Sequence, residues 1–171
     1  MVGMRYYFAV PIFLLALLIQ TTIMWRLPIF GFSPNLLLCM VIVFSFLYNE
    51  SYGLILGIAF GLLLDISTSI FLGTQTISFV FVFIVVRIFR NIFNHESIIL
   101  DMLMALIATP INVMLVWVIN RLLGVPDSIV YALKSLLPLM FLNFLLVGVL
   151  HLIFVRTVIR HKQDTKFTGA M

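Results

Sequence analysis

Apolar residues fill most of the chain in long runs, and short polar or turn-forming segments separate these runs. A helix of about 20 apolar residues is long enough to cross a bilayer, and somewhat shorter runs cross where the bilayer is thin. The pattern therefore predicts six membrane-spanning helices in a single integral membrane domain, residues 1–171. The expected spans are residues 6–25, 34–48, 52–66, 75–89, 98–118 and 136–155.

The break between the second and third spans decides this number. A continuous helix over residues 36–66 would be about 46 Å long, whereas the hydrocarbon core is about 30 Å thick. Asn49, Glu50 and Ser51 interrupt the apolar run at its middle. We therefore expect a tight hairpin of two short spans, with an even number of crossings in total.

Capping and turn residues mark several other boundaries. Ser33 and Pro34 suit the cap and the first position of the second span. Gly73 falls in the turn before the fourth span. Residues 128–135 are expected to lie along the membrane interface, so that Pro138 would fall in the first turn of the sixth span. A short basic cytoplasmic tail, residues 156–171, is expected to follow.

Composition supports a membrane solvent, since 64% of the residues are hydrophobic and 9% are charged. A soluble domain has about a quarter of its residues charged. The net charge of +4 is gathered at the ends of the spans, which is typical of membrane proteins and not of nucleic-acid binding. Because cytoplasmic ends collect Lys and Arg, both termini are expected in the cytoplasm, together with Arg5, Arg87, Arg90, Arg156, Arg160, Lys162 and Lys166.

The third span contains Gly53, Gly57, Gly61 and Asp65, which recur every four residues. Residues at this spacing form one stripe along a helix. Glycine lets a second backbone approach closely, which is how membrane helices commonly associate. The stripe therefore indicates either an ordinary helix contact inside the bundle or a surface that binds a partner.

Asp65 lies inside a predicted span, where a carboxylate is costly unless it faces protein or water and has a partner. It also falls near a helix C-terminus, where the helix dipole disfavours negative charge. One interpretation is local capping by the amides of Ser67, Thr68 or Ser69. The other is a functional contact.

Three further polar side chains fall at a similar depth in the outer half of the bundle: Gln20, Asn112 and Asn143. They would make ordinary interhelical hydrogen bonds, each pair worth about 1 kcal/mol. Alternatively, together with Asp65, they would line a polar hollow that opens to the outside.

Catalytic chemistry has little support in the sequence. His95 and His151 are far apart in the pattern, and no nucleophile stands beside a base. Cys39 is the single cysteine, which excludes an intrachain disulfide. No catalytic residue, metal ligand or cofactor is therefore expected.

The second and third spans resemble the rod shape-determining protein MreD family. That family typically has Pro followed by Asp or Asn before a leucine run, and then a glycine-spaced helix that ends in Leu-Leu-Asp. Here Pro34 and Asn35 precede Leu36-Leu37-Leu38, and residues 53–66 contain the glycine stripe and Leu63-Leu64-Asp65. The chain has Asn35 where an acid is common in the family, so a role for a charge at that position is not expected here.

The resemblance implies a non-enzymatic scaffold subunit of the bacterial cell-elongation machinery, located in the plasma membrane. Its partners would be MreC and, through MreC, MreB, RodA and a class B penicillin-binding protein, and it would support rod shape and lateral peptidoglycan synthesis. The implied fold is similar to the six-helix substrate-binding components of vitamin transporters. The alternative function is such a component of a small-molecule transporter, with Gln20, Asp65, Asn112 and Asn143 around its ligand.

Overall fold

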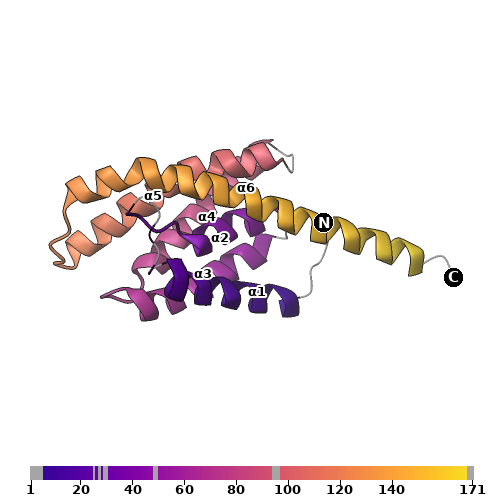
Figure 1. Ribbon diagram of the computed structural model, residues 1–171, viewed down its shortest axis with the longest axis horizontal. Helices are drawn as coiled ribbons and strands as arrows, with labels where there is room; N and C mark the ends of the chain where they lie inside the picture. The colour runs from indigo at the N-terminus through magenta and orange to yellow at the C-terminus, as the bar shows by residue number, and fades with distance from the viewer. Residues whose placement is uncertain are drawn as a thin grey trace.

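A computed structural model describes residues 6–24, 26, 28, 31–47, 50–93 and 97–168. The elements in these residues are helices, arranged as an elongated bundle (Figure 1). They are α1 (Tyr6–Ile19), the π-helical segment η1 (Gln20–Met24), α2 (Leu36–Leu47), α3 (Glu50–Thr68), α4 (Thr74–Phe93), α5 (Ile98–Leu122) and α6 (Ile129–Thr168). The predicted all-helical fold is confirmed in this described part of the chain.

Helix α2 is the centre of the bundle. Every side chain from Leu36 to Phe46 is buried, and α2 contacts each of the other five α-helices. A helix that is apolar on all sides is either enclosed by protein or surrounded by lipid, and here protein encloses α2. Because protein surrounds it, α2 does not have to match the thickness of the lipid, and this explains why twelve residues are enough for it.

Helix α1 packs on this centre through Ala9, Phe13 and Ala16. The ring centroids of Phe13 and Phe44 lie 5.0 Å apart in an edge-to-face arrangement, and those of Phe13 and Phe60 lie 5.2 Å apart with the rings tilted by 43°. Edge-to-face packing of this kind is favourable for aromatic pairs. Three aromatic rings thus join α1, α2 and α3.

The outer surface is apolar, in contrast to that of a soluble bundle. Large hydrophobic side chains are exposed along the five α-helices that surround α2, among them Leu15, Ile66, Ile84, Leu103 and Leu137. Contiguous exposed apolar surface of this extent marks contact with lipid or protein. Three helical segments are long and apolar enough to cross a bilayer, Thr74–Ile92, Ile98–Leu122 and Ile129–Val155, and three shorter ones are also apolar, Ala9–Met24, Leu36–Phe46 and Gly53–Thr68.

The last helix differs from its prediction. Residues 129–135 are the first turns of α6, which runs unbroken through Pro138 and past residue 155 to Thr168 (Figure 1). Ala132 and Ser135 are buried, so this segment packs on the bundle and does not lie apart at the interface. Neighbouring helices make a proline inside a membrane helix tolerable. Asn49, in the predicted break, lies outside the described residues.

Candidate functional site: an inward glycine stripe and a polar cavity

The glycine stripe of α3 faces α2 and α4. A Cβ atom on Gly53 would lie 2.6 Å from Ser45 Oγ, and one on Gly57 would lie 3.5 Å from a methyl group of Val41. The pairing of 53 with 45 and of 57 with 41 shows that α2 and α3 run antiparallel. A Cβ on Gly61 would lie only 2.9 Å from the Thr76 Cα of α4. The chain's own helices therefore occupy the stripe, and no room for a partner helix is left against these glycines.

Asp65 is fully buried in the last turn of α3, and it caps the start of α4. Its Oδ1 accepts the Gln75 N–H at 2.8 Å and the Ser69 hydroxyl at 2.9 Å. Its Oδ2 accepts the Gly73 N–H at 3.0 Å, the Thr76 N–H at 3.0 Å and the Thr76 hydroxyl at 2.8 Å. Carboxylates are favoured at helix N-termini, where the dipole is positive and amides lack partners.

The carboxylate is capped, but none of the backbone amides expected as its donors takes part. The Ser69 hydroxyl takes part, but the three backbone donors come from the turn and first residues of α4 and not from Ser67, Thr68 or Ser69. Gly73 has a positive φ of 98°, which glycine adopts without strain and which lets the turn bring its N–H back to Asp65. Asp65 is absent from the lining of the polar cavity described next.

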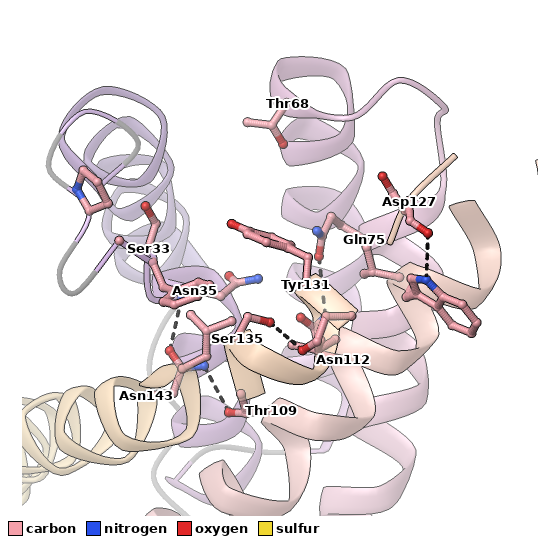
Figure 2. A pocket seen from close by; sticks show the side chains of 18 of the residues that line it. Ser33, Asn35, Thr68, Gln75, Thr109, Asn112, Asp127, Tyr131, Ser135 and Asn143 are labelled. Carbon is pink, nitrogen blue, oxygen red and sulfur yellow. Dashed lines mark hydrogen bonds between the residues drawn. The ribbon is translucent and has the colours of Figure 1, made fainter. Parts of the chain in front are cut away.

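A cavity of about 730 Å³ opens at one end of the bundle. It lies among η1, the segment before α2, the end of α3, the start of α4 and the adjoining ends of α5 and α6 (Figure 2). Gln20, Asn112 and Asn143 all line it, as expected for an outer polar hollow. They come from three elements far apart in sequence, and the fold brings them together around this one space.

Asn143 of α6 joins three helices at the bottom of the cavity. Its Oδ1 accepts the Asn35 N–H at 3.1 Å, and its Nδ2 donates to Thr109 Oγ1 at 3.0 Å (Figure 2). Asn143 and Thr109 are each 1% exposed, so water does not reach the bond between them. The start of α2 is thereby fixed against α5 and α6.

Asn35, and not Ser33, caps α2. The Asn35 side-chain oxygen accepts the Leu38 N–H at 3.0 Å, which is the usual geometry of an asparagine N-cap. The Ser33 hydroxyl instead donates to the Met24 carbonyl at 2.6 Å, and Pro34 lies before the helix. Gln20 supports the same start, because its Oε1 accepts the Leu36 N–H at 2.7 Å.

Asn112 of α5 connects to α4 on the other wall of the cavity. Its Nδ2 donates to Ser78 Oγ at 2.7 Å and approaches Gln75 Oε1 at 3.5 Å. Ser78 is fully buried. The three predicted polar residues therefore make interhelical hydrogen bonds and also line a hollow, so the two interpretations of them are compatible.

A buried pair that the sequence did not reveal joins α5 to α6 far from the cavity. Asp101 in the first turn of α5 is hydrogen-bonded to His151 Nδ1, and the two residues are 0% and 6% exposed. No local spacing indicates the pair, because fifty residues separate its members; a useful signal would have been two ionisable residues at matching depth on antiparallel neighbours.

Among the described residues, no three His, Cys, Asp or Glu side chains lie close enough together to hold a metal ion. Cys39 is fully buried on α2. In the part of the chain that the structure describes, the site is thus a set of amide and hydroxyl groups around a cavity, held by helix packing.

Helices with an apolar exterior, close glycine contacts and hydrogen-bonded polar groups in the interior define an integral membrane bundle. The family model of the rod shape-determining protein MreD matches residues 3–160, and the chain belongs to that family. It is therefore a rod-shape-determining membrane protein of the MreBCD system, and the resemblance is confirmed. No curated protein and no solved structure matches the chain.

Proposed function

We propose that this chain is a non-enzymatic scaffold that binds MreC and, through it, supports lateral peptidoglycan synthesis with MreB, RodA and a class B penicillin-binding protein. The family match over residues 3–160 is the observation that supports this function. The bundle also suits a scaffold, because tight glycine contacts and a saturated carboxylate hold α2, α3 and α4 in one arrangement.

The partner's helix would pack on the exposed face of α3, since the glycine face is covered. Ile55, Ile58, Leu62 and Ile66 are between 42% and 63% exposed, and Ala59 lies among them. Ile55, Ile58, Ile66 and Leu62 follow helical spacing, so they form one apolar strip. A single membrane-spanning helix such as that of MreC would cover this strip, with Ala59 allowing close approach.

We propose six crossings of the bacterial plasma membrane with both termini in the cytoplasm. The three longer apolar helices, α4, α5 and α6, would cross in lipid contact, and α1 with η1, α2 and α3 would complete the set. The cavity would then open on the outer side of the membrane, and the Asp101–His151 pair would lie near the cytoplasmic side. A fold similar to that of vitamin-transporter substrate-binding components is part of this proposal.

Co-purification tests the scaffold. The tagged chain, gently extracted from membranes, should bring MreC and RodA with it, and a transport ATPase in their place would favour the transporter alternative. Recovery of neither MreC nor RodA would contradict the scaffold.

A matched pair of variants tests the contact face. Ala59→Trp should lose MreC because the ring blocks close approach, whereas Ile84→Trp, on the exposed face of α4, should retain it. Retention of MreC by Ala59→Trp would place the contact elsewhere, without affecting the scaffold proposal itself.

A further inference from the structure

The polar cavity has hydrogen-bonding capacity that the fold does not use. Among the described residues, the Nδ2 group of Asn35, the Nε2 group of Gln75 and the Oδ1 atom of Asn112 take part in none of the hydrogen bonds. All three side chains line the cavity, and Figure 2 shows them around the same space. Two amide donors and one carbonyl acceptor are therefore available to a ligand in the cavity.

The lining holds almost no charge. Asp127 is the one acidic side chain among the described lining residues, none of which is Lys, Arg or His. Asp127 is exposed, and its Oδ2 already accepts the Asn120 side-chain amide at 2.7 Å. A phosphate, carboxylate or ammonium group in the deep part of this cavity would lack a counter-charge, which costs several kcal/mol. A ligand for this cavity must therefore be neutral.

The mouth is aromatic and one wall is apolar. The rings of Phe32 and Tyr131 lie 5.7 Å apart at a tilt of 41°, and Trp117 lines the same opening, its indole N–H donating to the Asp127 carbonyl at 3.2 Å. Val113 and Val116 continue the apolar wall along α5. Flat apolar rings beside amide groups match a sugar ring, which has C–H faces and hydroxyl edges.

We propose that this cavity binds a neutral polyhydroxylated group, either as a free sugar or as the headgroup of a glycolipid. The volume of about 730 Å³ lies within the usual range of small-molecule sites, about 300–1,000 Å³. The amides of Asn35 and Gln75 donate to hydroxyl oxygens, and Asn112 Oδ1 accepts from a hydroxyl. This site is additional to the scaffold function and does not depend on MreC.

Trp117 is a built-in reporter of occupancy. In a Trp25→Phe background it is the remaining tryptophan of the two in the chain. The protein would be placed in nanodiscs of phosphatidylethanolamine and phosphatidylglycerol. Its fluorescence would then be titrated with N-acetylglucosamine, with monoglucosyl diacylglycerol and, as a charged control, with glycerol 3-phosphate.

A saturable change with N-acetylglucosamine supports a free-sugar ligand, and one with the glycolipid alone supports a lipid headgroup. Val113→Phe, which fills the cavity, should abolish the change, and Gln75→Leu should weaken apparent affinity about tenfold. Val118→Phe, exposed on the same helix, should behave as wild type.

Three results would overturn the proposal: no response to either neutral probe, equal affinity for glycerol 3-phosphate, or unchanged binding in both Val113→Phe and Gln75→Leu. Circular dichroism of each variant confirms its fold. If Val113→Phe misfolds, the affinity of Gln75→Leu alone tests the proposal. The Gln75 side chain makes only the 3.5 Å contact with Asn112, so its loss should leave the fold intact.

Discussion

Asp65 Oδ2 accepts both the backbone N–H and the side-chain hydroxyl of Thr76, at 3.0 Å and 2.8 Å. The two residues belong to different helices, so one carboxylate ends α3 and begins α4. Negative charge is unfavourable at a helix C-terminus and favourable at an N-terminus. At Asp65 the second effect prevails, because five hydrogen bonds point at the carboxylate from the α3–α4 turn and the start of α4.

Asp65→Asn should destabilise the protein by about 3 kcal/mol, since an amide has one acceptor oxygen and its NH2 group would oppose backbone donors. The measurement is the midpoint of thermal unfolding in detergent. Asp127→Asn, at an exposed acid, is the control and should leave the midpoint within error. Equal midpoints for the two variants would show that the cap contributes little.

Gly61→Ala should destabilise strongly, and Gly57→Ala should be nearly neutral. The added Cβ would meet the Thr76 backbone at 2.9 Å in the first case, where only a helix shift relieves it. In the second it would meet Val41 at 3.5 Å, an ordinary contact. Overpacking typically costs about 1–3 kcal/mol. Unfolding midpoints measured side by side check this order, and the reverse order would refute the packing described for the stripe.

Asp101 and His151 should be energetically coupled across α5 and α6. Loss of either partner leaves a buried polar group, so Asp101→Asn and His151→Phe should each destabilise, by about 2–3 kcal/mol. The double variant should cost less than the sum, with a coupling above about 1 kcal/mol. A double-mutant cycle from thermal unfolding provides the measurement, and strictly additive effects would mean that the pair is not coupled.

Asn143→Leu should destabilise by about 2 kcal/mol, because it leaves the Asn35 N–H without its acceptor and removes the bond from Asn143 Nδ2 to Thr109 Oγ1. Thr109→Val removes one of those bonds and should cost roughly half as much. Hydrogen exchange should show faster exchange at the start of α2 in the Asn143 variant alone. Uniform protection in both variants would indicate that other contacts hold α2.

Membrane orientation can be read by cysteine labelling in a Cys39→Ser background, which removes the single native thiol. Ser128→Cys lies at the exposed cavity end and should react with an impermeant maleimide in intact cells. Asn91→Cys, exposed near the end of α4, should react only after the membrane is opened. The opposite pattern would place the termini outside.

Helix content and the inward polar residues were predictable because they depend on local composition. Long apolar runs and the four-residue glycine spacing identify α3 from sequence alone. The helical start of α6 could also have been predicted, since Ala132, Ser135 and Leu139 recur at helical spacing. All three face the bundle or its cavity. Pro138 suggested a helix start, but it lies inside α6.

The donors of Asp65 and the partner of His151 could not be read from the sequence in the same way. Each depends on how two helices are placed, and the spacing within one helix carries no information about its neighbour. The same holds for the glycines: their four-residue period predicts a close contact, but not that Gly57 faces α2 while Gly61 faces α4. These pairings are set by the packing of the whole bundle.

The cap at Asp65 has a consequence for biogenesis. While α3 alone has entered the membrane, its carboxylate lacks the Gly73, Gln75 and Thr76 donors, and an unpartnered acid in lipid is costly. Entry of α4 supplies them at once. The two helices should therefore leave the insertion machinery as a pair. In a nascent chain halted after residue 68, α3 should remain beside the insertion machinery until translation proceeds beyond α4.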